Sequence, residues 1–253
     1  NMILEIDAGN TRIKWRCLNP GTAAMAAEGV VSGVKELIIA VGENHRVEFA
    51  RLCSVRAGPD VEEIRQWIAA AWGPELQIAE VSRSCGGVSN HYVDPGKLGV
   101  DRWLAMLAAR QISTEPCVIV DSGTALTIDV LDRNGEHRGG FILPGLNLMR
   151  KSLQENTGIR VAEGQEELTL ELGHSTEAAV FNGTLPALIA TIETVINSIT
   201  EAGQPTLFLT GGGADLLAAY TSLPKIEVVA GLVLDGLAIA CPYSPEGFDP
   251  ANG

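Results

Sequence analysis

A short stretch near the start of the chain places an acid, a glycine and a lysine at a spacing that suits a phosphate site. The apolar run from Met2 to Ile6 ends on Asp7, the chain turns at Gly9, and alternating residues resume toward Lys14, which is typical of strand, tight turn and strand. Glycine in the turn permits a positive φ and leaves no Cβ between the backbone N–H groups and an anion. Asp7 could hold a hydrated cation and Lys14 could neutralise charge. One such copy is explained equally well by an ordinary β-hairpin.

A second copy of this pattern favours the functional interpretation. Residues 118–132 read VIVDSGTALTIDVLD, which is an apolar run that ends on Asp121, a turn through Gly123 and Thr124, and a second alternating run. Asp121 follows Asp7 by almost half the chain. Each half therefore opens with the same hairpin, and we predict that the two hairpins bind phosphate together from the two sides of a cleft.

Composition limits the classes of protein that the chain can represent. It has 253 residues, 46% of them hydrophobic, and a formal net charge of −13, so a substantial core is expected and disorder is not. No basic run exceeds two residues, which argues against nucleic acid or an anionic membrane surface as a partner. Any anionic substrate must then be bound by individual basic residues near the site.

Cysteine and histidine spacing predicts no metal site. The cysteines are odd in number and lack CxxC spacing, and the histidines lack HxxxH or HExxH spacing, so we expect free, mostly buried thiols in a reducing cytoplasm. We also expect no secretory signal and no membrane span, because the first strand begins at once and no apolar run reaches the length of a span.

The first half is expected to contain three strands, a helix, a strand, a helix and a strand. After the hairpin these are a strand at 27–31, a helix at 34–41, a strand at 47–55, a helix with Asp60 as N-cap, and a strand at 76–81. Residues 82–99 have no clean period and are rich in glycine, and such a long loop is often functional. This loop leads into a helix that begins near Val100.

The second half repeats this order. Strands are expected at 117–121, 125–132, 137–143, 206–210 and 226–229, and helices at 146–154, 175–200, 214–220 and 232–240. Pro186 should kink or split the long helix. The glycines at 211–213 are explained by a strand-to-helix turn or by close approach of adenosine or phosphate. We expect an N-terminal domain at 1–115, a C-terminal domain at 116–242 and a loose tail at 243–253.

This order is not a Rossmann arrangement, since neither GxGxxG nor GxxxxGK[ST] is present. The ordered motifs instead resemble those of the type III pantothenate kinases, in the superfamily of actin, acetate kinase and hexokinase. They are DAGNTRIK (7–14), GVDR (99–102), DSGTA (121–125), PGL (144–146), GHSTEAAVFNG (173–183) and TGGGA (210–214). The resemblance implies an α/β fold of two duplicated ribonuclease-H-like (actin-like ATPase) domains, each a mixed five-stranded sheet flanked by helices, with a cleft between them.

The resemblance also implies an activity. A member of this family transfers the γ-phosphoryl group of ATP to the terminal hydroxyl of pantothenate, which gives 4′-phosphopantothenate in the first step of coenzyme A biosynthesis. The implied cofactors are Mg²⁺ with ATP and a monovalent cation, K⁺ or NH₄⁺. A cytoplasmic homodimer with the acceptor site near its interface is implied as well.

Site residues carry over by their positions in the motifs. Asp101 matches the catalytic general base, and Asp121 matches the monovalent-cation ligand. ATP-binding positions are Asp7, Ala8, Gly9, Asn10, Thr11, Arg12, Ile13, Lys14 and Thr124, and acceptor-binding positions are Tyr92, Gly99, Val100, Asp101, Arg102 and Thr176. Ser122 and Val100 depart from the residues common in the family. Neither removes a reactive group, although Val100 alters the fit expected at the acceptor.

Each of these residues also has a purely structural interpretation. Asp101 could be a helix-start acid with a surface partner, Tyr92 could pack a loop, and Lys14 could be solvated. Thr176 could be a first-turn residue after Ser175 as N-cap. Two other functions remain open: a kinase of another small hydroxylated acceptor, and a non-catalytic nucleotide-binding regulator that acts through a protein partner.

Overall fold

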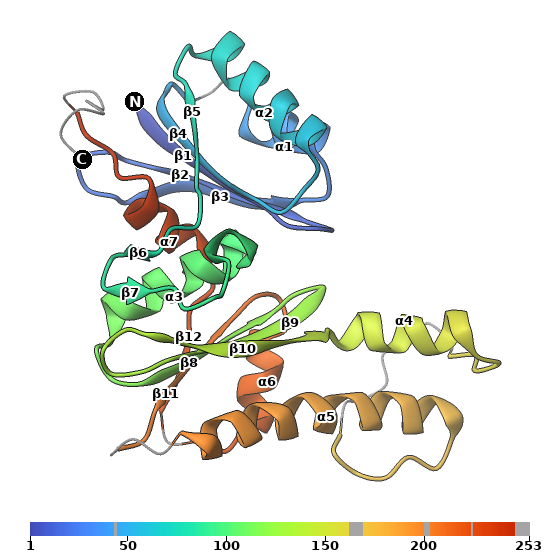
Figure 1. Cartoon of the computed structure of the whole chain (residues 1–253). Coiled ribbons are helices and arrows are strands. Elements are labelled where there is room, and N and C mark those ends of the chain that lie inside the picture. Colours follow the sequence, from blue (N-terminus) through green and yellow to red (C-terminus); the bar gives the residue numbers. More distant parts are fainter. Residues whose placement is uncertain (43–44, 162–168, 200–202, 224, 246–253) are drawn as a thin grey trace. The chain divides into compact units, whose positions relative to one another are not determined.

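A computed structural model describes residues 1–42, 45–161, 169–199, 203–223 and 225–245 (Figure 1). The chain forms two compact units. Unit 1 contains residues 1–112 and the C-terminal segment from Gly231, and unit 2 contains Ser113–Ala230. Each unit is described by itself below.

Unit 1 is built on a mixed five-stranded sheet in the order β3-β2-β1-β4-β5 (Figure 1). The strands β1, β2 and β3 are antiparallel neighbours, and β4 and β5 extend the sheet in parallel with β1. Strands are β1 (Met2–Ala8), β2 (Ile13–Leu18), β3 (Met25–Val31), β4 (Val47–Ser54) and β5 (Leu76–Ile78). Helices are α1 (Val34–Val41), α2 (Gly58–Ala71), α3 (Val100–Ile112) and α7 (Leu232–Ala240).

The period-two pattern of the first hairpin explains how it joins the core of unit 1. Successive side chains of a strand point to opposite faces of the sheet. One face carries the buried core side chains Leu4, Ile6, Ala8, Ile13, Trp15 and Cys17, which pack with apolar residues of α1 and α2. Asp7 therefore points to the face opposite this core.

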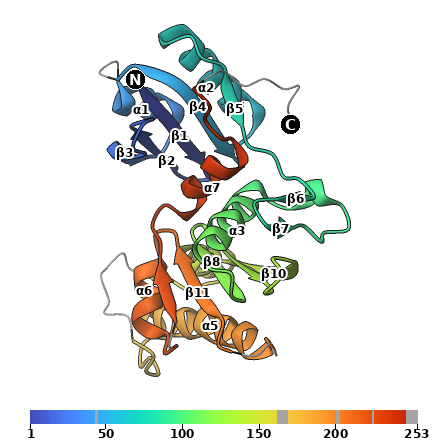
Figure 2. The same ribbon diagram turned by 90° about the vertical axis from the view of Figure 1, so that its left-hand side faces the viewer.

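Unit 2 repeats the connectivity of unit 1, with the sheet order β10-β9-β8-β11-β12 (Figure 1). Figure 2 shows β8, β10 and β11 of this sheet from another side. Its strands are β8 (Cys117–Ser122), β9 (Ala125–Leu131), β10 (His137–Pro144), β11 (Thr206–Thr210) and β12 (Ile226–Val228). Its helices are α4 (Leu146–Asn156), α5 (Thr176–Ser198) and α6 (Ala214–Tyr220). Two mixed five-stranded sheets with flanking helices confirm the expected α/β fold class.

The predicted N-cap of α2 was wrong. The helix begins at Gly58 with Ala57 as its N-cap, and Asp60 lies in the first turn. Pro59 explains the shift, because proline suits the first turn, where its missing N–H costs nothing. The Asp60 carboxylate accepts a hydrogen bond from the Arg56 guanidinium at 3.3 Å.

Pro186 does not split the long helix, since α5 is continuous from Thr176 to Ser198. Proline inside a helix costs about 3 kcal/mol. Each fully buried aliphatic side chain contributes about 1.5–3 kcal/mol, and α5 buries Leu185, Leu188 and Ile192 completely in the core of unit 2. Burial of this face therefore outweighs the cost of the proline.

The same helix is long and apolar enough to cross a membrane by length and composition alone, although no uninterrupted apolar run in the sequence reaches the length of a span. Half of the apolar stretch is buried inside the unit. Its buried side chains include Val195 and Ile196, which belong to the core cluster that contains Val118, Val120 and Leu207 of the sheet. The apolar face of α5 is thus a core face of unit 2.

The two units differ from the expected domains at 1–115 and 116–242, because the last helix belongs to the first unit. α7 belongs to unit 1, where it packs on α3 so closely that a Cβ on Gly236 would lie 2.2 Å from the Leu104 carbonyl oxygen. The expected loose tail begins with an ordered residue, because the Tyr243 hydroxyl donates to Glu48 at 2.7 Å. Residues 246–253 of that tail lie outside the described residues.

Candidate functional site

The first hairpin places Asp7 and Lys14 directly opposite each other. They are register partners in the antiparallel pair β1–β2, one residue from the ends of the strands that meet at the turn. The turn between them contains the exposed residues Asn10, Thr11 and Arg12. An acid and a base side by side at the root of an exposed turn fit the expected phosphate site.

The glycines of the two turns do not have the positive φ that was expected. Neither Gly9 nor Gly123 has a positive φ. The Gly9 N–H donates to the Arg12 carbonyl at 2.9 Å, and the Gly123 N–H donates to the Ala125 carbonyl at 3.0 Å. A Cβ on Gly9 would lie only 3.2 Å from the Arg12 oxygen. Any side chain at position 9 would therefore be in tight contact with the backbone inside the hairpin.

Sequence inspection missed Arg56, which fixes the first turn from the outside. Its Nε donates to the Gly9 carbonyl at 2.6 Å, and its Nη2 donates to the Ser32 carbonyl at 3.0 Å. An arginine after a strand has no spacing signal that marks it as a partner of a turn far away in the sequence. The turn of the hairpin is thus held by a cation as well as by its own backbone.

In unit 2, two glycine-containing segments pack against the second hairpin. The Gly145 N–H donates to the Thr124 carbonyl at 2.9 Å, and a Cβ on Gly145 would lie 2.4 Å from the Gly123 carbonyl oxygen. Gly211, at φ +86°, lies so close that a Cβ there would be 2.5 Å from Asp121 Oδ1. The motifs at 121–125, 144–146 and 210–214, distant in sequence, are therefore assembled at one end of the sheet of unit 2.

The loop from Ser82 to Gly99 starts with a small hairpin of β6 (Ser84–Cys85) and β7 (Val88–Ser89). Gly86 and Gly87 both have positive φ, as a two-residue hairpin turn requires. The loop then passes through a short 3₁₀ helix at Pro95–Lys97, where Asp94 caps the start through a hydrogen bond from the Gly96 N–H. It ends at α3, which carries the GVDR motif.

Five predicted acceptor residues lie together where this loop meets α3. Asp101 Oδ1 accepts the Arg102 backbone N–H at 2.9 Å, and a Cβ on Gly99 would lie 2.8 Å from the same oxygen. The Arg102 guanidinium donates to the Tyr92 hydroxyl at 2.9 Å and lies 5.7 Å from the centre of its ring. Val100 begins the helix. The structure therefore brings Tyr92, Gly99, Val100, Asp101 and Arg102 into one cluster in unit 1.

Arg102 is buried, with 6% of its surface exposed. A buried guanidinium is unfavourable unless acceptors and negative charge surround it. Its planar fork suits a carboxylate in particular, because it can donate two parallel hydrogen bonds. The cluster can thus combine a carboxylate that accepts a proton with a guanidinium that holds an anion.

Thr176 is the first residue of α5, in unit 2. Ser175 is the N-cap, as proposed in the structural alternative, and its hydroxyl accepts the Ala178 N–H at 3.0 Å. Thr176 is exposed. Capping by the neighbouring serine leaves the Thr176 side chain available for a substrate contact.

Among the described residues, no group of three His, Cys, Asp or Glu side chains could hold a metal ion. Mg²⁺ in kinases usually keeps several waters and binds through one or two carboxylates together with substrate phosphates. Asp7 and Asp121 each stand near the end of the first strand of a sheet. The backbone packed around Asp121, where a Cβ would not fit, forms a cradle of the kind that a metal–phosphate group requires.

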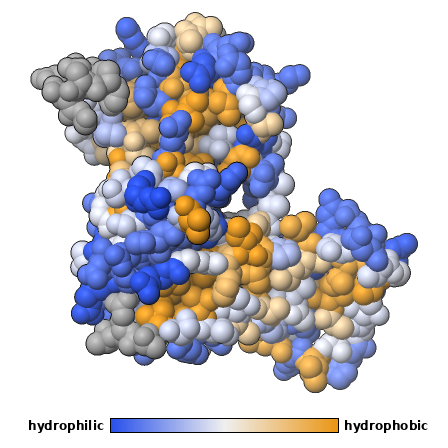
Figure 3. Space-filling model, in the orientation of Figure 1, coloured by the Kyte–Doolittle hydropathy of each residue, from blue (hydrophilic) through white to orange (hydrophobic). Residues whose placement is uncertain are grey.

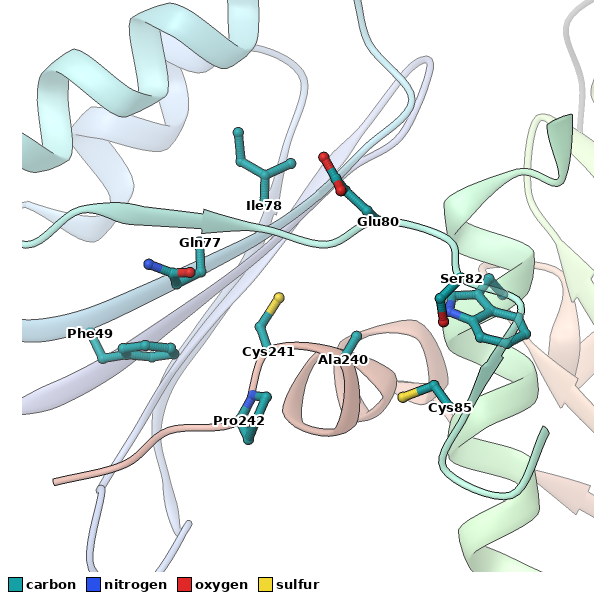
Figure 4. Close-up of a pocket in the computed structure, with 10 residues that line it drawn as sticks. Phe49, Gln77, Ile78, Glu80, Ser82, Cys85, Ala240, Cys241 and Pro242 are labelled. Carbon is teal, nitrogen blue, oxygen red and sulfur yellow. The ribbon is translucent and has the colours of Figure 1, made fainter. Parts of the chain in front are cut away.

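Two pockets lie apart from these residues. One in unit 1, of about 280 Å³, is shown in Figure 4 and is lined by Phe49, Gln77, Ile78, Glu80, Ser82, Cys85, Trp103, Ala240, Cys241 and Pro242. The other, of about 690 Å³ in unit 2, is lined by Val130, Asp132, Arg138, Gly139, Gly140, Phe141, Val195, Ser198 and Ile199. Neither includes a predicted site residue, so the candidate site rests on the motif clusters.

Comparison with known sequences gives consistent matches over most of the chain. A sequence profile described as type III pantothenate kinase matches residues 3–198. A type III pantothenate kinase of Ectopseudomonas mendocina is 40% identical over 253 residues, which cover 96% of this chain and 100% of that protein. Another, of Azotobacter vinelandii, is 37% identical over 95% of this chain and 99% of that protein.

Solved structures share the fold at lower identity. A Campylobacter jejuni protein described as a Baf family transcriptional activator has a TM-score of 0.61 at 21% identity, over 92% of this chain and 94% of that one. The activator of 2-hydroxyisocaproyl-CoA dehydratase from Clostridium difficile, with bound ADPNP, has a TM-score of 0.51 at 14% identity, over 95% and 93% of the two chains. These likenesses support the actin-like fold class.

Proposed function

This chain belongs to the type III pantothenate kinase family, and from that premise we propose which of its residues carry each part of the reaction. The enzyme phosphorylates pantothenate with ATP and a divalent metal ion. Phosphoryl transfer passes through a loose transition state, so the protein contributes mainly by positioning the reactants and by stabilising charge. A divalent metal ion held near Asp7 would supply positive charge that neutralises the phosphates during transfer.

The two hairpins hold the nucleotide phosphates in this proposal. The turn of residues 7–14 in unit 1 offers Lys14 and the exposed backbone of Asn10 to Arg12. The turn in unit 2 offers Thr124 beside the packed glycines. Support comes from the duplicated topology, which gives each unit the same acid at the same place in the same strand.

Asp101 acts as the general base in this proposal. The observation that carries the assignment is the position of its carboxylate, in the first turn of α3, held by the Arg102 N–H and against Gly99. A carboxylate held in this way can orient the acceptor hydroxyl and take its proton late in the transfer. General bases of this kind contribute about 10²- to 10⁴-fold to the rate.

Arg102 binds the carboxylate of pantothenate, with Tyr92 beside it and with Gly99, Val100 and Thr176 as further acceptor contacts. The hydrogen bond from Arg102 to the Tyr92 hydroxyl supports this assignment, because it fixes the plane of the guanidinium. A guanidinium that is oriented before binding loses little further freedom when it binds a planar anion.

Four further assignments complete the proposal. Asp121 binds a monovalent cation, K⁺ or NH₄⁺, the enzyme works in the cytoplasm, and its partner is a second copy of the chain and not nucleic acid. Support for a homodimer comes from exposed apolar side chains of unit 2, namely Phe141, Ile142 and Leu148, on β10 and α4. Figure 3 shows hydrophobic surface over these two elements.

The role of Arg102 is tested with two acceptors, pantothenate and the alcohol in which CH₂OH replaces its carboxylate. Arg102→Gln should lower kcat/KM for pantothenate about 10- to 100-fold, because a charged hydrogen bond is lost. The kcat/KM for the alcohol should fall much less. Coupled ADP release measures both acceptors, and Arg65→Gln, which removes a partly exposed arginine of α2, is the control.

Equal losses on both acceptors would contradict the carboxylate contact. A panel of other small hydroxylated acids in the same assay tests the substrate itself. Activity on one of them with none on pantothenate would favour the alternative kinase, and nucleotide binding without turnover of any acceptor would favour the regulator.

A further inference from the structure

Asn90 is a buried polar residue in the loop that carries Tyr92. Only 1% of its surface is exposed. A buried amide is costly unless its donors and acceptor are satisfied. Its position therefore shows that the surrounding loop is shaped to match it.

The Asn90 side chain joins three separate parts of the loop. Its Nδ2 donates to the Ser82 carbonyl at 3.4 Å and to the Pro95 carbonyl at 3.2 Å, and its Oδ1 accepts the Tyr92 N–H at 3.0 Å. Two carbonyls on one side and an N–H on the other fix the orientation of the amide. A carboxylate of the same shape would face two carbonyl oxygens with no proton to donate.

Arg83, on the surface of the loop, holds the same segment through further hydrogen bonds. Its Nη1 donates to the Asn90 carbonyl and to the Tyr92 carbonyl, both at 3.2 Å, while the Arg83 carbonyl accepts the Asn90 N–H at 2.8 Å. Arg83 is exposed. Tyr92 is thus held at both its N–H and its carbonyl, and its hydroxyl is left to meet Arg102.

We propose that Asn90 and Arg83 are positioning residues for acceptor recognition, because they hold Tyr92 where its hydroxyl orients the Arg102 guanidinium toward the pantothenate carboxylate. This rests on the proposed role of Arg102. Neither residue contacts the reacting atoms. Both act on acceptor affinity, and the general base on α3 does not depend on them.

The test uses full-length Asn90→Asp and Arg83→Ala, with KM for pantothenate, KM for ATP and kcat measured separately. Asn90→Asp should raise the pantothenate KM about tenfold or more, since a small misplacement of a binding group is costly. Arg83→Ala should raise it about three- to tenfold, because two hydrogen bonds from an exposed cation are lost. The ATP KM should stay unchanged in both, and kcat should stay within about twofold.

Lys97→Ala is the matched control for Arg83→Ala. It removes a positive charge from the same loop at an exposed position and should leave both KM values unchanged. A double-mutant cycle with Tyr92→Phe tests the route of the effect. Without the Tyr92 hydroxyl, Asn90→Asp should add little to the pantothenate KM, because residues that act through one contact are not additive.

The inference is overturned if the pantothenate KM of both variants stays within about twofold of wild type, or if the KM for ATP rises in parallel, as a general loss of structure predicts. Arg83→Ala keeps the test decisive if Asn90→Asp does not fold, because Arg83 lies on the surface. Failure of the inference is separable from failure of the Arg102 assignment. If Arg102→Gln discriminates against the carboxylate and these two variants do not alter the pantothenate KM, only the positioning role is lost.

Discussion

Cys17 shows how a single buried residue makes stability depend on pH. It lies on β2 with no exposed surface, inside the core of unit 1. Burial raises the pKa of its thiol to about 11. The thiol therefore stays protonated in the folded protein at pH values where it would ionise in the unfolded chain.

We expect Cys17 to stabilise the fold at neutral pH and to lose this contribution as pH rises. Because the folded pKa is the higher one, the contribution is complete below the unfolded pKa and is lost as pH approaches the folded value. Between about pH 8 and about pH 10 the free energy of unfolding should fall by roughly 1 to 2 kcal/mol more in wild type than in Cys17→Ala. Urea unfolding at both pH values measures the difference, and equal pH slopes would refute it.

At the scale of elements, the proposed ATP site of unit 2 depends on how closely backbone segments approach the second hairpin. Gly145 precedes α4, and a Cβ there would overlap the carbonyl oxygens of Gly123 and Thr124, at 2.4 and 2.7 Å. Backbone atoms cannot move aside as the end of a side chain can. Any larger residue at position 145 must shift the turn that carries Thr124.

Gly145→Ala should therefore raise the ATP KM about tenfold or more, since displacement of a positioned loop by a fraction of an ångström is costly to binding. The pantothenate KM should change much less, because the proposed acceptor contacts lie mainly on unit 1. Gly158→Ala is the control, since a Cβ there meets no atom within 4 Å. An unchanged ATP KM in Gly145→Ala would show that the turn of unit 2 does not contact the nucleotide.

Periodicity predicted most of the elements, because burial of one sheet face imposes it on a strand. The helix at 34–41 has the predicted bounds, and the strand expected at 47–55 ends one residue earlier, at Ser54. The N-cap of α2 was predicted incorrectly, and of the two outcomes expected at Pro186 in α5, a kink or a split, the structure excludes the split. In both places a proline acted together with packing that a local pattern does not contain. Likewise a positive φ was expected at the turn glycines, but neither has one, and only Gly9 is in tight contact with another backbone atom.

The candidate site was predictable where a motif is contiguous, as at Gly99 to Arg102. It was not predictable where a side chain reaches a distant backbone atom. Asn90 and Arg56 both act in this way, and their partners are main-chain carbonyl and N–H groups that exist at every position. Only the fold determines which of them is near.

At the scale of the whole molecule, the last helix of the chain, α7, belongs to unit 1. Ion pairs and a hydrogen bond from buried and partly buried arginines hold it against the sheet. Glu5 is completely buried between Arg16 and Arg51. Arg16 also pairs with Asp235 at 2.8 Å, and Arg51 donates to the Cys241 carbonyl at 2.9 Å. Burial alone would lower the pKa of Arg16, but the hydrogen bond and charge of Glu5 raise it above its ordinary value.

Glu5→Gln should destabilise the protein by about 3 to 5 kcal/mol, because it leaves the buried Arg51 guanidinium without the carboxylate it pairs with and leaves Arg16 only its pair with Asp235. Urea unfolding at neutral pH measures this loss. Glu63→Gln, at an exposed position of α2, should change stability by less than about 0.5 kcal/mol. A loss no larger than that of the control would mean that water or rearranged neighbours stabilise the arginines, and that α7 is held by its apolar contacts alone.

The most direct test of the account is the rate of phosphoryl transfer in a single turnover for wild type and Asp101→Asn, with ATP, Mg²⁺ and pantothenate saturating. Asparagine keeps the oxygen that accepts the Arg102 N–H, so calorimetry should give affinities for both substrates close to those of wild type. Transfer measured by rapid quench should be slower by about 10²- to 10⁴-fold. Transfer at the wild-type rate with both substrates bound would contradict the assignment of Asp101 as the general base.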